Sequence, residues 1–228
     1  RSTQFGAGGG LVGSLVVIAA LVTLGAVKPP SYTRATQTLT VSLLQTNVPQ
    51  DQKFAETHLP EALGWATKAI TEASGDLVIG PETVVPLLPD QLPKGYWETM
   101  LRRFHRSEQA ALIGRPLGSY EAGYTNSVVG ISKDTVLQPS GSYRYDKHHL
   151  VPFGEFIPAG FRWFTDLINI PLGDFNRGPL KASSFVFKGE RIAPNICYED
   201  LFGEELAARF TDMTTAPTIF ANLSNIGW

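Results

Sequence analysis

The first strong pattern along the chain is an apolar run near its beginning. No charged residue occurs over residues 5–27, and residues 11–27 are almost wholly apolar. About 20 such residues can cross the hydrocarbon of a bilayer, and the Lys-Pro-Pro sequence that follows ends the run because proline cannot continue a helix. We therefore expect a transmembrane helix over residues 5–27; a signal-peptide core and a buried helix are the alternatives. The chain starts at Arg1, without the methionine and basic region of a signal peptide, and we expect it to be part of a longer protein.

A polar linker over residues 28–37 leads into a region where two periodicities alternate. Residues 39–45 alternate between apolar and polar positions, as in a half-buried strand. Over residues 59–73, apolar residues recur at spacings of four and three, which places them on one face of an amphipathic helix. The continuous apolar run at residues 77–79 is typical of a strand buried on both faces.

Similar patterns predict a helix over residues 96–106 and strands over residues 110–113, 126–132, 142–145, 184–187, 191–196 and 219–223. Turns are expected at residues 114–116 and 118–123, where glycine and proline gather. These elements predict a mixed α/β domain over residues 38–228.

Residues 153–179 interrupt this alternation of strands and helices. The stretch is rich in aromatic residues, shows little periodicity and is punctuated by prolines and glycines. An irregular insert of this length in a compact domain is usually functional or mobile. Near its start, within residues 151–156, Glu155 is a lone acid among apolar groups, so this carboxylate is expected to be either satisfied by a hydrogen bond or functional.

Composition narrows the function classes. A net charge of −2, with no long charged block, gives no electrostatic basis for binding nucleic acid. The chain has four histidines, and the adjacent pair His148 and His149 would point to opposite faces of a strand, so they are a poor set of metal ligands. The single cysteine, Cys197, cannot form an intrachain disulfide. We therefore expect no metal and no nucleic-acid partner, and a thiol that is available for chemistry.

Cys197 lies at the junction that suggests chemistry most strongly. The apolar run over residues 191–196 leads into it, and a helix-like segment over residues 200–210 follows. A thiol at such a strand-to-helix elbow stands out of the strand plane, near the partial positive charge of the first helical turn. A lone cysteine is also often an inert buried residue, so both interpretations remain open on this observation alone.

Two further polar residues follow predicted strands. Glu82 comes just after residues 77–79, and a carboxylate at the end of a buried strand suits a general base. Lys147 comes just after residues 142–145, where an ammonium can hold a thiolate by charge and donate to an oxyanion. The plainer interpretations are a solvated loop glutamate and an ordinary surface lysine.

Together, Glu82, Lys147 and Cys197 resemble the Glu-Lys-Cys triad of the nitrilase (carbon–nitrogen hydrolase) superfamily. Four sequence blocks are, more specifically, similar to the apolipoprotein N-acyltransferase family, bacterial membrane enzymes that complete lipoproteins: residues 45–50, 80–83, 147–156 and 197–200. The Lys-His-His-Leu-Val-Pro-Phe-Gly-Glu block is the most diagnostic of these. The resemblance covers about residues 39–228, and the apolar run fits the membrane helix that precedes the family's nitrilase domain.

The resemblance implies a fold and a triad. The fold would be the superfamily's αββα four-layer sandwich, truncated here at its C-terminal end. Glu82 would be the base, Lys147 the oxyanion and charge partner, and Cys197 the nucleophile.

Supporting or substrate-binding roles are implied for Glu155, Tyr198, Glu199 and Phe54. Phe54 stands where the family often has a tryptophan. Residues 224–228 read Ser-Asn-Ile-Gly-Trp where Ser-Asn-Asp-Ala-Trp is usual, so this wall of the expected pocket departs from the family pattern.

The implied reaction moves a fatty acyl chain from a phospholipid, through a cysteine thioester, to the N-terminal amine of a diacylglyceryl-cysteine apolipoprotein, without a cofactor. The enzyme would lie in the bacterial inner membrane with its catalytic domain on the periplasmic face. The aromatic insert would line an acyl channel or contact the membrane interface, or else form a lid packed on the protein. The alternatives are an amidase- or nitrilase-type hydrolase with water as the acceptor, and a membrane-anchored binding domain whose site has decayed.

Overall fold

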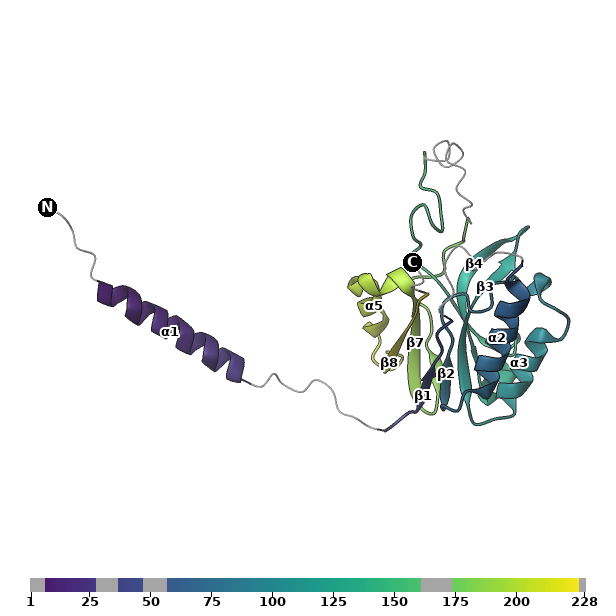
Figure 1. The fold of residues 1–228 in the computed structure, drawn as a ribbon, viewed down its shortest axis with the longest axis horizontal. Helices are drawn as coiled ribbons and strands as arrows, with labels where there is room; N and C mark the ends of the chain where they lie inside the picture. Colours follow the sequence, from purple (N-terminus) through teal and green to yellow (C-terminus); the bar gives the residue numbers. More distant parts are fainter. Residues whose placement is uncertain (1–6, 28–36, 47–56, 161–173, 226–228) are drawn as a thin grey trace. The chain divides into compact units, whose positions relative to one another are not determined.

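The computed structural model describes four stretches of the chain, residues 7–27, 37–46, 57–160 and 174–225 (Figure 1). The chain divides into two compact units, Arg1–Thr38 and Leu39–Trp228. The predicted site residue Phe54 lies outside the described residues, as does the middle of the aromatic insert.

The first unit has one helix in its described part, α1 (Ala7–Ala26). Its apolar residues are spread around the helix instead of along one face, and Leu15, Val22 and Leu24 are exposed. Within the part of the chain that the structure describes, no helix combines the length and the apolar character needed to cross a membrane. The transmembrane helix expected over residues 5–27 therefore stays a prediction.

The second unit contains a five-stranded sheet with the strand order β1-β2-β3-β4-β5. The first three strands are parallel, whereas β4 runs antiparallel to both β3 and β5. β5 therefore points the same way as β2, and the ends of both strands lie at one edge of the sheet. The bounds of the strands are β1 (Val41–Leu43), β2 (Leu77–Ile79), β3 (Ala110–Ser119), β4 (Gly123–Ile131) and β5 (Tyr143–Asp146).

Helices α2 (Leu59–Glu72) and α3 (Tyr96–His105) cover one face of this sheet (Figure 1). The buried residues of α2 are Leu63, Ala66 and Ile70, which follow the spacing that predicts the helix. They pack in one apolar cluster with residues of α3, such as Phe104, and of the sheet. Burial of this stripe, not backbone propensity, supplies most of the stability of such a helix.

A second sheet has the strand order β6-β7-β8, with β6 (Phe185–Phe187) antiparallel and β8 (Ile219–Leu223) parallel to the central β7 (Glu190–Ile196). Its inner face packs on the other face of the first sheet in a second apolar cluster. On its far side lies the short helix α5 (Gly203–Ala207), flanked by the 3₁₀ segments η3 (Cys197–Leu201) and η4 (Ala208–Phe210). Two more 3₁₀ segments, η1 (Pro89–Gln91) and η2 (Lys133–Leu137), lie in connections of the first sheet.

The predicted mixed α/β class is confirmed, and in the second unit two facing sheets have helices outside them (Figure 1). One local prediction is wrong, because residues 114–116 form no turn and continue β3 to Ser119, and β4 begins at Gly123. Beyond Leu112, β3 is paired with β4 alone. At such an edge position the missing N–H of Pro116 disturbs the sheet little.

Candidate active site

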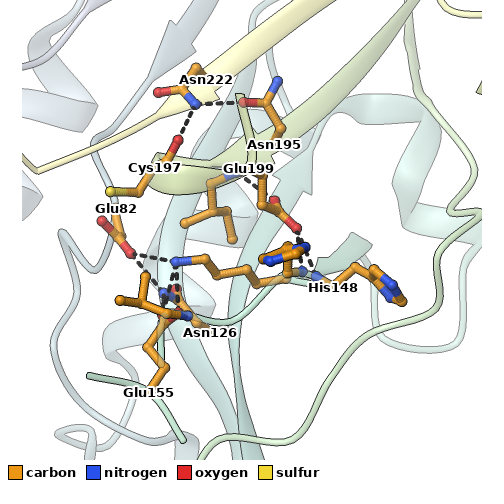
Figure 2. A network of polar contacts seen from close by, with 12 residues as sticks. Glu82, Asn126, His148, Glu155, Asn195, Cys197, Glu199 and Asn222 are labelled. Carbon is orange, nitrogen blue, oxygen red and sulfur yellow. Dashed lines mark hydrogen bonds and ion pairs between the residues drawn. The ribbon is translucent and has the colours of Figure 1, made fainter. Parts of the chain in front are cut away.

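The three predicted triad residues follow three different strands and meet at one end of the two sheets (Figure 2). Glu82 comes after β2, Lys147 directly follows β5, and Cys197 directly follows β7. Figure 2 shows the Cys197 thiol turned toward the Glu82 carboxylate, and Lys147 forms an ion pair with the same carboxylate. Residues far apart in the sequence are thereby brought together as an acid, an amine and a thiol.

Lys147 is the buried charge around which the carboxylates gather. Its side chain is only 1% exposed, and its Nζ lies 2.8 Å from Glu155 Oε2 and 3.7 Å from Glu82 Oε1. Burial by itself lowers the pKa of Lys147, but the negative charges of Glu155 and Glu82 outweigh it, so the pKa stands above its usual value. The Lys147 ammonium therefore stays charged near neutral pH, and a positive charge at this place can stabilise a developing oxyanion.

Two expectations were stated for Glu155, a carboxylate satisfied by a hydrogen bond or a functional one, and the structure agrees with the first. Its Oε2 accepts from the backbone N–H of Val151 at 2.9 Å, and its Oε1 accepts from Lys147 Nζ at 3.0 Å. The buried carboxylate is thus held by its own turn and holds the lysine in return. Such pairing is what makes a buried carboxylate tolerable.

Asn126, in β4, belongs to the same cluster and was missed by the sequence reasoning. Its Nδ2 donates to Glu82 Oε1 and to Glu155 Oε1, each at 2.8 Å. One amide group therefore links the two carboxylates and keeps both near Lys147. The only signal in the sequence was a polar residue at the start of an apolar strand, and such residues are common. Asn126 Oδ1 is buried and has no hydrogen-bond partner among the described residues.

Cys197 is where the strand β7 turns into η3. Its φ is +51°, in the left-handed region that residues with a side chain rarely adopt. The side chain is half-buried and the thiol is free. The strand-to-helix elbow expected from the sequence is confirmed, although the segment that follows is broken into η3, α5 and η4 instead of one helix.

Glu199 ties this elbow to the turn that carries Lys147. Its carboxylate is buried and accepts four hydrogen bonds, from the Tyr145 hydroxyl and from the backbone N–H groups of Ile196, His148 and His149. Burial and the negative charge of Glu199 raise the pKa of Tyr145, so its hydroxyl remains a donor. Glu199 is thus engaged by protein groups on both sides and holds two parts of the site in register.

Tyr198 packs against the elements behind the elbow. Its ring contacts those of His149 and Phe202 edge-on, with centroids 5.7 and 5.0 Å apart. His149 stacks on Phe202 and lies 2.9 Å from Glu205 Oε1 through Nδ1. These contacts hold the segment η3–α5 against the turn that follows Lys147.

Two glycines allow the turns of the site to approach their neighbours. A Cβ on Gly114 would clash with Pro81 O and lie 2.9 Å from Glu82 Cα, and one on Gly178 would clash with Asp146 O. Gly178 also donates its N–H to Lys147 O at 2.8 Å. No group of three or more histidine, cysteine, aspartate or glutamate side chains in the described stretches is arranged to hold a metal ion.

Comparison with known proteins shows which proteins the chain is related to. No known protein-family profile matches the chain. A protein from Verminephrobacter eiseniae named apolipoprotein N-acyltransferase is 55% identical over 201 residues, which are 88% of this chain and 37% of that protein. The chain is a homologue of part of the apolipoprotein N-acyltransferases. An apolipoprotein N-acyltransferase from Ralstonia nicotianae is 44% identical over 190 residues, 83% of this chain and 36% of the relative. The chain therefore spans little more than a third of the length of these apolipoprotein N-acyltransferases.

Two solved structures are also similar. A carbon–nitrogen hydrolase from Helicobacter pylori G27 matches with a TM-score of 0.44 and 19% identity, covering 82% of this chain and 59% of that one. A carbon–nitrogen hydrolase superfamily protein from Xanthomonas campestris matches with a TM-score of 0.45 and 18% identity, covering 82% of this chain and 63% of that one.

Proposed function

We propose that this chain carries the cysteine-dependent acyl-transfer centre of an apolipoprotein N-acyltransferase. Glu82 acts as the base, Cys197 as the nucleophile and Lys147 as the oxyanion and charge partner. The observation that carries the proposal is the meeting of these three groups, with Lys147 Nζ 3.7 Å from Glu82 Oε1 and the thiol turned toward that carboxylate (Figure 2). The 55% identity to a named relative supports the choice of reaction.

In the first half-reaction, Glu82 accepts the thiol proton and the sulfur attacks the carbonyl carbon of a phospholipid ester. The tetrahedral oxyanion forms beside the Lys147 ammonium. When the C–O bond breaks, the leaving alkoxide takes the proton from Glu82, and a lysophospholipid departs. The acyl chain remains on Cys197 as a thioester. Covalent catalysis of this kind divides one transfer between two substrates that need not be bound together.

In the second half-reaction, the N-terminal α-amine of a diacylglyceryl-cysteine apolipoprotein attacks the thioester. Glu82 accepts a proton from the attacking nitrogen, the C–S bond breaks, and the proton returns to the sulfur. Glu155 and Asn126 bind no substrate in this scheme. They keep Lys147 and Glu82 in place through the hydrogen bonds described above.

The proposed location follows from the proposed substrates. Both are lipids, so we place the enzyme in the bacterial inner membrane, with the catalytic domain on the periplasmic face. The exposed apolar side chains of α1 support burial of residues 5–27 in lipid. The aromatic residues of the insert are proposed to contact the acyl chain.

Trapping the thioester tests the assignment. The chain is incubated with a phosphatidylethanolamine in mixed micelles, quenched in acid and analysed by intact mass. We expect a mass increase of one acyl group on Cys197, absent from the Cys197→Ser variant and removed by hydroxylamine. Release of the acyl group to a diacylglyceryl-cysteine peptide, but not to water, supports the transferase. Acyl transfer at the normal rate by Cys197→Ser would overturn the proposal.

Water as the acceptor is the competing reaction of the same three groups, that of an amidase- or nitrilase-type hydrolase. The same assay with short aliphatic amides in place of the phospholipid distinguishes the two. Turnover of the amide with no acylation by phospholipid would favour the hydrolase.

A further inference from the structure

The backbone carbonyl of Cys197 is held by a pair of asparagine side chains that take no part in the proposed reaction. Asn222 Nδ2 donates to Cys197 O at 3.0 Å, and the same NH₂ group donates to Asn195 Oδ1. Asn195 and Asn222 are register partners on the parallel strands β7 and β8. Figure 2 shows the two amides side by side next to the elbow.

The orientation of both amides follows from this carbonyl. A backbone carbonyl can only accept a hydrogen bond, so Asn222 must present its NH₂ group to Cys197 O. The second N–H of that group then requires an acceptor, and Asn195 provides its carbonyl oxygen. Asn195 is buried, and its bond therefore fixes which way the amide of the exposed Asn222 points.

This contact bears on the strained backbone of Cys197. Cys197 has φ +51°, and a residue with a Cβ keeps a left-handed conformation only where its surroundings hold it there. The C=O and N–H of one trans peptide group point in opposite directions. Holding Cys197 O therefore also sets the direction of the Tyr198 N–H. In Figure 2 the carbonyl faces Asn222 while the thiol faces Glu82.

We propose that Asn222, oriented by Asn195, is a positioning residue that keeps the Cys197 elbow (residues 196–198) in its left-handed conformation and so aims the thiol at Glu82 and Lys147. The inference rests on the proposed role of Cys197 as the nucleophile. It assigns to the end of β8 a part in the site that the triad alone does not indicate.

Substitution Asn222→Asp is the sharpest test. It preserves the size of the side chain but places a second acceptor against Cys197 O and Asn195 Oδ1. Because Asn222 lies on the exposed side of β8, the core stays packed. Cys197 is the only cysteine of the chain, so alkylation by iodoacetamide reports on this thiol alone. We expect the alkylation rate constant to fall about tenfold, the size of effect that the loss of one good hydrogen bond produces.

The matched control is Gln138→Glu, the same amide-to-acid change on an exposed residue at the end of η2, which should leave the alkylation rate unchanged. In acyl transfer, Asn222→Asp should lower kcat and leave KM unchanged, with a melting temperature equal to that of the control. Asn222→Gln, which keeps the donor, should regain part of the lost rate. A purely structural role for Asn222 would lower the melting temperature without this split between kcat and KM.

Alkylation of a folded Asn222→Asp chain at the rate of the unchanged chain would overturn the proposal. Should that variant unfold, Asn222→Ala removes the donor without adding a charge, and an unchanged rate there would overturn it equally. A chain whose thiol is alkylated readily but never forms a thioester with phospholipid would contradict the proposed function. The comparison of alkylation rates would still decide the role of Asn222.

Discussion

The two sheets of the second unit differ in how fully they are covered and in the residues that they contribute to the candidate site. The five-stranded sheet is packed on both faces, by helices on one side and by the second sheet on the other. The three-stranded sheet is packed on its inner face, whereas Val186 and Phe220 on its outer face are exposed. The acid and the amine follow strands of the first sheet, and the thiol follows a strand of the second. The paired charged groups thus come from the better-covered sheet, and the proposed nucleophile comes from the more open one.

The difference is also one of electrostatics. Lys147 and Glu155 are almost fully buried and stabilise each other at 2.8 Å, so neither can lose its partner without leaving an uncompensated charge. Cys197, by contrast, is half-buried and is held mainly through its backbone. A buried charged cluster opposite a half-buried thiol suits the proposed acyl transfer, in which large substrates must enter and leave.

The largest effect is expected from Lys147→Met, which removes the cation from the first sheet. Acyl-enzyme formation should fall about 10²–10³-fold because the proposed oxyanion donor is lost. Glu82 and Glu155 would lose their counter-charge, and we expect unfolding free energy to fall by about 3–5 kcal/mol. Single-turnover mass spectrometry and urea unfolding measure the two effects. Lys133→Met, which breaks the exposed ion pair with Glu108, is the control. If Lys147→Met lost no more activity than Lys133→Met, the proposed role of Lys147 would be refuted.

The next effect compares the two faces of the second sheet. Ile192 is fully buried between the sheets, whereas Phe220 is 41% exposed on the outer face. Ile192→Ala should lower the unfolding free energy by about 2–5 kcal/mol, and Phe220→Ala by less than about 1 kcal/mol because a partly exposed side chain leaves no closed cavity. Equilibrium urea unfolding gives both values. Equal losses would show that the outer face is as closely packed as the inner one.

A smaller effect is expected from Glu199→Gln, which probes the link between the two sheets. The amide keeps one accepting oxygen but presents donors to groups that also donate. The loss of charged hydrogen bonds should lower the unfolding free energy by about 1.5–3 kcal/mol. Thermal and urea unfolding measure this, with Glu121→Gln in the exposed β3–β4 turn as the control. Wild-type stability would mean that the two turns stay in register without Glu199.

The smallest effect is expected where a charge is buried in the first sheet away from the site. Arg115 is 2% exposed, and its Cζ lies 4.4 Å from the centroid of the Trp97 ring. Its Nε has no hydrogen-bond partner among the described residues. Burial lowers the pKa of Arg115 to about 10. Arg115→Met should therefore change the unfolding free energy by less than about 1 kcal/mol, toward greater stability. A loss of more than about 2 kcal/mol in urea unfolding would show that this guanidinium, like Lys147, is needed.

Much of the site was predictable because its residues sit where local patterns end. Glu82 and Cys197 follow apolar runs whose pattern predicts strands, and in the structure these strands, β2 and β7, belong to the two facing sheets. Asn126 and Asn222 gave no such signal, since an asparagine in a strand has the same local pattern whether it faces solvent or a carboxylate. Their roles depend on the register of β4 and β8 against distant turns. The turn predicted at residues 114–116 was wrong for the same reason, because strand pairing overrode the local preference of glycine and proline.

Local sequence patterns were enough to predict the mixed α/β class, the buried face of α2 and the order in which an acid, an amine and a thiol follow strands. Those features depend on periodicity and on residue type, which are local properties of the chain. The folded structure was needed to show that Lys147 is paired with Glu155 as well as Glu82, that Glu199 binds two turns together, and that Cys197 has a left-handed backbone conformation. Each of these depends on distances between segments far apart in the sequence, and no local pattern of side chains determines such distances.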